Sequence, residues 1–191
     1  MVRDLFRGEL VRLTAEEPEM LGRSISRWGR DSEYWRLLDD TPPQLWSAKE
    51  IQAWFEEVKG PYAETGTGFF IRTLGDDRLI GFVGLWDVLW SHGDAELGIG
   101  IGEREYWGKG YGSDALQLIL RYGFMEMNLS RITLGVFDYN KRALRSYEKA
   151  GFILEGRERK SVYRDRERAD IVYMGMLRDE WLALSGGGAH A

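Results

Sequence analysis

Three glycines at alternate positions, Gly108, Gly110 and Gly112, constrain the fold of this chain more than any other feature. They follow a strand-like run at residues 96–101 and open a helix-like run that continues to about Met127. Glycine lets the backbone bend tightly and leaves a row of N–H groups uncovered. Those N–H groups would lie at the positive end of a helix dipole, where a phosphate or diphosphate binds. The segment therefore predicts a strand–loop–helix unit for an anionic, nucleotide-containing ligand.

Two better-known glycine loops do not fit these residues. The phosphate loop of nucleoside triphosphatases needs a hydroxyl residue after Gly-Lys, but Gly110 follows Lys109, so no side chain is placed to hold magnesium. The dinucleotide fingerprint needs G-x-G-x-x-G early in a βαβ unit, whereas the spacing here is G-x-G-x-G, past mid-chain. On the loop alone, a strand–helix turn without a ligand stays open as the plain alternative.

Composition indicates a single-domain protein without a metal site. The 191 residues are 43% hydrophobic and 30% charged, which suits one domain over residues 1–184 and a flexible glycine-rich tail over residues 185–191. The absence of cysteine excludes a disulfide framework, a thiolate metal site and a cysteine nucleophile. Because two histidines cannot build a typical zinc site without help, we expect no metal.

Charge and hydropathy narrow the range of partners. The formal net charge of −5 argues against a nucleic-acid-binding surface and agrees with a cationic substrate. No apolar stretch approaches the length of a membrane span, and the first residues lack the apolar region of a signal peptide. We therefore expect a cytoplasmic protein with neither a nucleic-acid nor a membrane partner.

Local patterns predict the element order β, αα, βββ, α, β, α, ββ. A helical region at residues 16–40 is broken near Gly29, and a capping box of Ser47 and Glu50 opens a helix that continues to about Lys59 and ends at Gly60-Pro61. The residues expected to face inward in the first region are Met20, Ile25, Trp28, Trp35 and Leu38. The expected strands cover residues 9–14, 68–74, 78–86, 94–102, 131–136, 152–159 and 169–177, and the later helices cover residues 110–127 and 140–150. This order indicates a mixed sheet with an antiparallel meander, a βαβ crossover and a closing hairpin.

Three segments resemble the GNAT N-acetyltransferases. Residues 96–112 resemble the acetyl-CoA motif of that superfamily, and residues 140–152 resemble its N-x-x-A-x-x-x-Y-x-x-x-G-F element. Residues 170–181 resemble the branch with the ribosomal-protein N-terminal acetyltransferases (RimJ/RimL-like). The resemblance implies an α/β (α+β) fold, with a mixed, mostly antiparallel seven-stranded sheet flanked by helices and splayed at the strand preceding the CoA loop. One departure is Glu105, where many members have Gln or Arg.

The resemblance also implies which residues bind acetyl-CoA. Backbone groups of Ile99 and Ile101 would pair with the pantetheine amides, and the loop N–H groups would hold the diphosphate. The implied cofactor-binding residues are Ile99, Ile101, Trp107, Gly108, Lys109, Gly110, Tyr111, Gly112, Ser113, Asn140 and Ala143. Lys109 and Arg104 are candidate charge partners for phosphate, with the alternative that each is a solvated loop charge. Asn140 has the simpler role of a helix N-cap as its alternative.

The same resemblance implies an acid and a base. Tyr147 would protonate the departing CoA thiolate, although an aromatic residue on an apolar helix face is usually part of the core. Glu96 is the first candidate for the base that deprotonates the acceptor amine, and Asp94 is the second, because alternate residues of a strand share a face. Their alternative is a solvent-facing charge or, for Glu96, a scaffold ion pair. His92 lies just upstream in a probable turn and is expected to be a surface residue.

Together these observations predict an N-acetyltransferase that transfers the acetyl group directly to a primary amine. The amine could belong to a protein N-terminus, a polyamine or a small molecule, and the first helices and the closing hairpin would form its site. A non-catalytic acyl-CoA-binding module is the alternative, but it would not need Tyr147 or an acidic strand end. The apolar residues Ile171, Val172, Met174 and Met176 suggest a homodimer surface.

Overall fold

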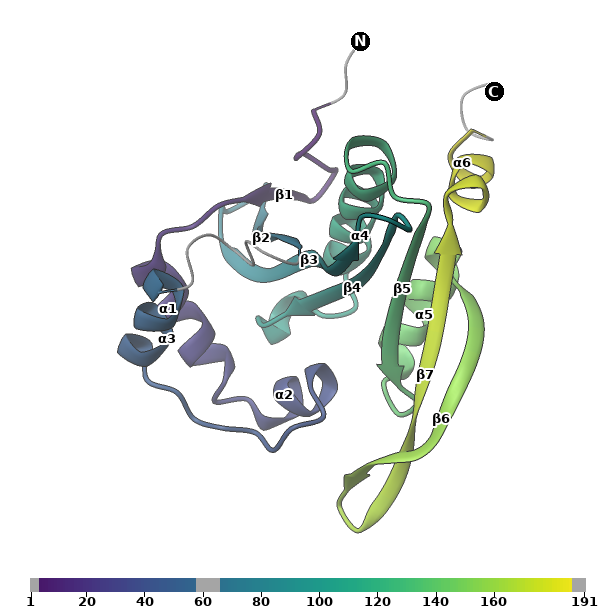
Figure 1. Cartoon of the computed structure of the whole chain (residues 1–191). Helices are drawn as coiled ribbons and strands as arrows, with labels where there is room; N and C mark the ends of the chain where they lie inside the picture. Colours follow the sequence, from purple (N-terminus) through teal and green to yellow (C-terminus); the bar gives the residue numbers. More distant parts are fainter. Residues whose placement is uncertain (1–3, 58–65, 187–191) are drawn as a thin grey trace.

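One seven-stranded sheet organises the chain, with strand order β1-β2-β3-β4-β5-β7-β6 (Figure 1). The computed structural model describes residues 4–57 and 66–186. The strands are β1 (Val11–Thr14), β2 (Thr67–Thr73), β3 (Leu79–Leu89), β4 (Asp94–Ile101), β5 (Arg131–Phe137), β6 (Ile153–Arg164) and β7 (Glu167–Leu177). The helices are α1 (Pro18–Trp28), α2 (Ser32–Leu38), α3 (Ala48–Glu57), α4 (Tyr111–Arg121), α5 (Lys141–Ala150) and α6 (Arg178–Gly186). The mixed, mostly antiparallel architecture predicted from the sequence is confirmed.

The pairing of β4 with β5 is the exception to the antiparallel rule. These two strands run parallel and pair only from Asp94 with Arg131 to Glu96 with Thr133. Beyond Glu96 the strands diverge, as Figure 1 shows, and the rest of β4 has no partner on that side. The splay expected at the strand before the glycine loop is therefore present.

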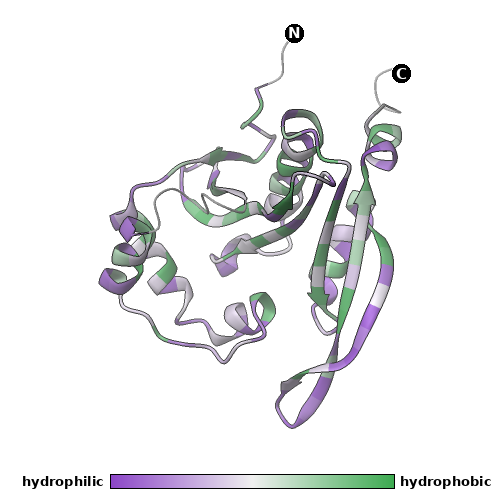
Figure 2. Cartoon of the chain, viewed as in Figure 1, coloured by the Kyte–Doolittle hydropathy of each residue, from purple (hydrophilic) through white to green (hydrophobic). Residues whose placement is uncertain are grey.

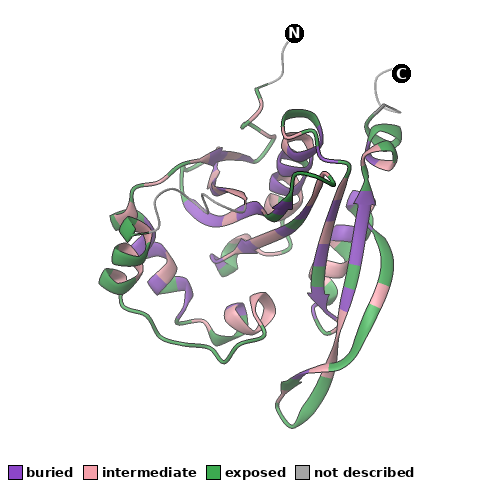
Figure 3. Cartoon of the chain, in the orientation of Figure 1, coloured by how far each residue is buried: buried purple, intermediate pink, exposed green. Residues whose placement is uncertain are grey.

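Helix α4 covers one face of the sheet and supplies much of the main core. Its Ala115, Leu116, Ile119 and Leu120 are almost completely buried, and Phe124 of the following π-helical turn joins them. A smaller cluster lies under α1 and α2 and contains Leu21, Trp28, Tyr34, Phe70 and Leu79. The far half of the β6–β7 hairpin is mostly hydrophilic (Figure 2) and mostly exposed (Figure 3), although its Val162 is buried.

Local capping signals in the sequence are reproduced in detail. Ser47 Oγ accepts a hydrogen bond from the Glu50 N–H at 3.2 Å, and Glu50 Oε2 accepts one from the Ser47 N–H at 2.8 Å. The predicted stop of this helix near Lys59 and Gly60-Pro61 lies outside the described residues. Gly151 ends α5 with φ of +104°, a left-handed conformation that glycine adopts without strain.

The inward face of the first helices differs from the expectation. Leu21 and Tyr34 are buried, whereas Met20 is 42% exposed and Ile25, Trp35 and Leu38 are only partly buried. Of the predicted inward set, Trp28 alone is fully buried. Leu21 and Trp28 are seven residues apart and so share one face of α1, while Met20 lies about 100° around the helix. The periodicity of apolar residues predicted helix α1 correctly, but tertiary packing determines which of its faces is buried.

The closing hairpin also corrects an expectation. Val172, Met174 and Met176 lie on the inward face of β7 and are at most 2% exposed, so they form core rather than a dimer surface. Ile171 is partly buried beside them.

Helix α6 was not predicted. Its Trp181 packs against Phe124 with ring centroids 5.5 Å apart, and residues 185 and 186 of the predicted tail belong to this helix. Residues 187–191 lie outside the described part of the chain.

Two carboxylates, a buried one and a partly buried one, join the elements around the glycine loop. Glu103 accepts hydrogen bonds from Trp28 Nε1 at 2.8 Å and from Arg78 at 2.8 Å, and it pairs with Arg27. Burial opposes its ionisation, but the bonds from Trp28 and Arg27 and the two positive charges hold the pKa of Glu103 below its usual value. Glu103 therefore joins α1 to β3 just before the loop.

Asp114 makes the second connection, from the first turn of α4 to the beginning of β1. Its carboxylate accepts the backbone N–H groups of Glu9, Leu10 and Val11 at 3.2, 2.7 and 3.0 Å. The start of α4 is thereby fixed against the sheet. Within residues 4–57 and 66–186, no helix combines the length and apolar character needed to cross a membrane.

Candidate functional site

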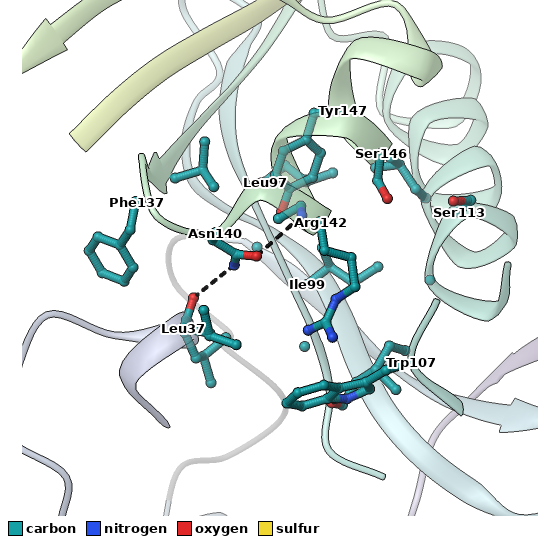
Figure 4. Close-up of a pocket in the computed structure, with 18 of the residues that line it drawn as sticks. Leu37, Leu97, Ile99, Trp107, Ser113, Phe137, Asn140, Arg142, Ser146 and Tyr147 are labelled. Carbon is teal, nitrogen blue, oxygen red and sulfur yellow. Dashed lines mark hydrogen bonds between the residues drawn. The ribbon is translucent and has the colours of Figure 1, made fainter. Parts of the chain in front are cut away.

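A cavity of about 450 Å³ occupies the gap where β4 and β5 diverge. It is bounded by α2, by the loop that precedes α4 and by α5 (Figure 4). Its lining residues are Tyr34, Leu37, Leu38, Glu96, Leu97, Gly98, Ile99, Gly100, Ile101, Tyr106, Trp107, Gly108, Gly110, Gly112, Ser113, Leu116, Gly135, Val136, Phe137, Asn140, Arg142, Ala143, Ser146, Tyr147 and Lys149. Most of the residues predicted from the two sequence motifs therefore meet at one cavity.

The glycine loop has the geometry of an anion cradle. Gly108 and Gly110 have φ of +70° and +93°, a backbone conformation that other residues adopt only with strain. The first hydrogen bond of α4 runs from the Asp114 N–H to the Gly110 carbonyl at 2.9 Å. The N–H groups of residues 111–113 therefore precede the intrahelical ladder and lie at the positive end of the helix. This arrangement fits the diphosphate of a CoA ester.

The open edge of β4 presents backbone groups to the same cavity. The Gly102 N–H donates to the Ile80 carbonyl of β3 at 2.8 Å. Because backbone groups of successive strand residues point to opposite edges, those of Ile101 and Ile99 point into the gap. The Ile101 carbonyl already accepts a hydrogen bond from Trp107 Nε1 at 2.6 Å. The backbone of Ile99 is thus the freer of the two to pair with a pantetheine amide.

Asn140 and Ala143 form the α5 side of the site. Asn140 Oδ1 accepts the Ala143 N–H at 3.2 Å, which is the expected N-cap interaction. Asn140 Nδ2 donates to the Leu37 carbonyl at 3.4 Å, so the same side chain also contacts the end of α2 (Figure 4). The small side chain of Ala143 leaves space at the cavity wall.

Tyr147 is buried on the core face of α5, and its hydroxyl points into the cavity (Figure 4). Its ring contacts Phe152 edge-on at 5.8 Å between centroids. Burial raises the pKa of Tyr147 to about 12, so the hydroxyl keeps its proton at neutral pH. Tyr147 is therefore a core aromatic whose protonated hydroxyl faces the cavity.

Glu96 and Asp94 lie on the same face of β4, but Glu96 alone of the two lines the cavity. Glu96 is an exposed residue that lines the cavity, and partial loss of hydration together with the negative charge of Asp87 raises its pKa above the ordinary 4.5. Asp94 pairs in register with Arg131 at the start of β4 and does not line the cavity. Geometry thus favours Glu96 over Asp94 as a proton acceptor at this site. His92 is an exposed turn residue, as expected.

The side chains of Lys109 and Tyr111 contribute less to the cavity lining than the backbone of the loop does. Lys109 is exposed and Tyr111 packs edge-on against Tyr106 at 4.9 Å, and neither lines the cavity. Arg104, a predicted phosphate partner, instead donates two hydrogen bonds of 2.7 Å to Asp31 and pairs with Glu33 at 2.6 Å. The departure at position 105 also has a local reason, because Glu105 pairs with Arg78.

Several lining residues were not predicted from the sequence. Leu37, Leu38 and Phe137 form an apolar end of the cavity, and Arg142 reaches it from α5. Arg142 lies within the N-x-x-A element, at one of its unspecified positions, so the motif gave no signal for it. Among the described residues, no group of three or more His, Asp or Glu side chains is placed to hold a metal ion.

Comparison with known proteins assigns this arrangement to a family. Residues 9–153 match the family model described as acetyltransferase (GNAT) domain. The chain belongs to the GNAT acetyltransferase family. It is accordingly an acetyl-CoA-dependent N-acetyltransferase, and the nucleotide-containing ligand expected from the loop is acetyl-CoA.

Individual GNAT relatives cover most of the chain. The uncharacterised N-acetyltransferase YnaD of Bacillus subtilis (strain 168) is 32% identical over 159 residues, which is 83% of this chain and 89% of that protein. YdaF of the same organism, named for ribosomal N-acetylation, is 31% identical over 165 residues, 85% of each chain. The spermidine N(1)-acetyltransferase of Escherichia coli (strain K12) is 28% identical over 163 residues, 80% of this chain and 84% of that protein. These relatives agree with the predicted RimJ/RimL-like branch.

A solved GNAT structure shows the same fold with ligands. The spermidine N-acetyltransferase from Vibrio cholerae in complex with CoA and spermine has a TM-score of 0.79 and 25% identity, and the match covers 90% of this chain and 98% of that chain. That complex supports the use of a CoA ester by the fold.

The loop backbone should matter more for acetyl-CoA than the loop charge. Replacing Gly110 with Val puts a β-branched residue at φ of +93° and a Cβ 3.3 Å from Leu10 Cδ1, so we expect affinity to fall roughly tenfold or more. Lys109→Ala should change affinity little, because an exposed charge is screened. Isothermal calorimetry on both variants, with thermal unfolding to confirm folding, tests this. A folded Gly110→Val protein with wild-type affinity would contradict the cradle.

Proposed function

We propose that this enzyme transfers the acetyl group directly from acetyl-CoA to a primary amine in the β4–β5 cavity, with no covalent enzyme intermediate. The observation that carries the proposal is the meeting of three parts at one cavity: the N–H cradle, Glu96 and the Tyr147 hydroxyl. The chain has no cysteine, which agrees with direct transfer. The cofactor-binding residues proposed are those of the two motifs that line the cavity, and Lys109 and Tyr111 contribute through their backbone.

Each proton transfer has a residue suited to it. An ammonium has no lone pair, so Glu96 accepts one of its protons, directly or through water, before the amine attacks the thioester carbonyl. Tyr147 donates its proton to the sulfur as the C–S bond breaks, which releases CoA as a thiol. The nitrogen loses its second proton as the amide forms, and this proton balances the one that the Tyr147 phenolate takes back. A general acid or base is effective when it holds the right protonation state and lies close to the reacting atom.

The acceptor class separates catalysis from simple binding. Peptides with a free N-terminus, polyamines and small-molecule amines would be screened as acceptors. Turnover would be measured as the release of the free CoA thiol. The spermidine acetyltransferases among the relatives make polyamines the first group to test. Turnover with any of these amines supports the proposal. Tight binding of acetyl-CoA without turnover on any of them would favour the non-catalytic acyl-CoA-binding module.

We also propose that the protein works in the cytoplasm, without nucleic acid as a partner. The formal charge of −5 supports this, because a surface for nucleic acid needs a basic face. The same charge favours encounter with a cationic amine.

The substitution Tyr147→Phe removes the hydroxyl and keeps the ring, so it tests the role of the hydroxyl alone. Because the ring keeps its contact with Phe152, we expect acetyl-CoA affinity and thermal stability to stay close to wild type. Turnover should fall by roughly 10²–10⁴, the usual range for a positioned general acid. The matched control is Tyr122→Phe, which removes a hydroxyl from a partly buried ring that packs on Phe69, away from the cavity. Wild-type turnover in Tyr147→Phe would make water the proton donor.

Glu96 should determine the acid side of the pH profile. Only the deprotonated carboxylate accepts a proton, and its pKa is raised, so kcat/KM should rise with pH through a value above 4.5. Glu96→Gln should lower turnover by roughly 10²-fold or more and remove this limb. Asp94→Asn, on the same strand face but outside the cavity, is the control and should keep the limb. A Glu96→Gln enzyme with an unchanged profile would exclude Glu96 as the base.

We further propose a homodimer, on a surface different from the one predicted from the sequence. Leu154, Leu177, Leu182 and Leu184 are 55%, 45%, 43% and 60% exposed on β6, β7 and α6, and β6 is an edge strand of the sheet. A second copy would bury these side chains. Light scattering at micromolar concentration should give twice the monomer mass, and Leu182→Glu should shift it towards the monomer. A wild-type monomer at these concentrations would reject the dimer.

A further inference from the structure

Arg142 reaches from α5 across the cavity to the loop side of the site. Its guanidinium lies over the Trp107 ring, 3.9 Å from the ring centroid, and both side chains line the cavity (Figure 4). Trp107 is held in place by its hydrogen bond to the Ile101 carbonyl. Stacking on a fixed indole leaves the in-plane N–H donors of an arginine available to another acceptor.

Arg142 is a partly buried cation without a carboxylate partner. Among the described residues it forms no ion pair. Burial lowers its pKa, the negative charge of Glu33 partly opposes this shift, and the positive charge of Arg104 adds to it. The other arginine at the Trp107 ring, Arg104, is neutralised by Asp31 and Glu33. Lys109, the loop cation, is exposed and does not line the cavity. The site therefore has an unpaired arginine where an anionic cofactor is expected.

We infer that Arg142 is a cofactor-binding residue that recognises the diphosphate of acetyl-CoA. The inference rests on the proposed function of this cavity. Trp107 directly precedes Gly108, and the stacked guanidinium lines the same cavity as the glycine loop. A planar guanidinium donates two parallel hydrogen bonds to phosphate oxygens, which a lysine cannot reproduce. The cradle supplies backbone donors, and Arg142 supplies the positive charge that the sequence motif had suggested for Lys109 and Arg104.

Affinities for three ligands distinguish a contact to the diphosphate from contacts to the rest of the cofactor. Calorimetry would compare acetyl-CoA, 3′-dephospho-acetyl-CoA and acetyl-pantetheine, which lacks all phosphates and the nucleoside. Arg142→Ala should weaken the first two ligands by about tenfold or more and leave acetyl-pantetheine unchanged. Arg142→Lys should recover only part of the loss. Arg145→Ala, an exposed position on the same helix, is the matched control and should bind all three ligands as the wild type does.

Salt dependence gives a second measurement that a packing role would not affect. Acetyl-CoA affinity of the wild type should fall as salt rises, and Arg142→Ala should show a shallower dependence. Equal losses for acetyl-CoA and acetyl-pantetheine would overturn the inference and assign Arg142 to packing. A loss for acetyl-CoA but not for the dephospho form would also overturn it, in favour of the 3′-phosphate. Wild-type protein that binds none of the three ligands would instead refute the proposed cofactor site itself.

Discussion

The divergence of β4 from β5 is the constraint on which the rest of the site depends. A paired strand uses its backbone donors and acceptors on both edges, but β4 loses one partner after Glu96. The opened gap gives the molecule a cavity and an unpaired strand edge at the same place. The glycine loop continues from this edge, so the proposed positions of the pantetheine amides and of the CoA diphosphate are consecutive in sequence. A conventional parallel pair would have neither.

Loss of hydration raises the pKa values of the two groups that we propose for the proton transfers. Burial raises the pKa of the Tyr147 phenol, so this hydroxyl stays protonated at neutral pH. Burial and Asp87 raise the pKa of Glu96, which makes its carboxylate a better proton acceptor. Tyr147 comes from α5 and Glu96 from β4, and both side chains line the same cavity.

Features governed by neighbouring residues were predictable from sequence, and features governed by distant contacts were not. The Ser47–Glu50 capping box, the Asn140 cap and the glycine loop depend on local backbone geometry, and all are present. The inward face of α1, the burial of Met174 and Met176 and the pairing of Arg104 with Asp31 depend on residues remote in sequence. Arg142 belongs to this second group, because its importance comes from Trp107, on a different element.

Asp114 has a consequence for protein engineering. The backbone that it holds is separated from it by about a hundred residues, yet Gly8 lies so close that an added Cβ would be 2.3 Å from the Asp114 carboxylate. Leu10 extends from the same segment to the loop at Gly110. The segment at residues 8–11 thus holds the start of α4 in position. A sequence change that disturbs Gly8 or Glu9 therefore also changes the support of the glycine loop, although these residues lie about a hundred positions away in the sequence.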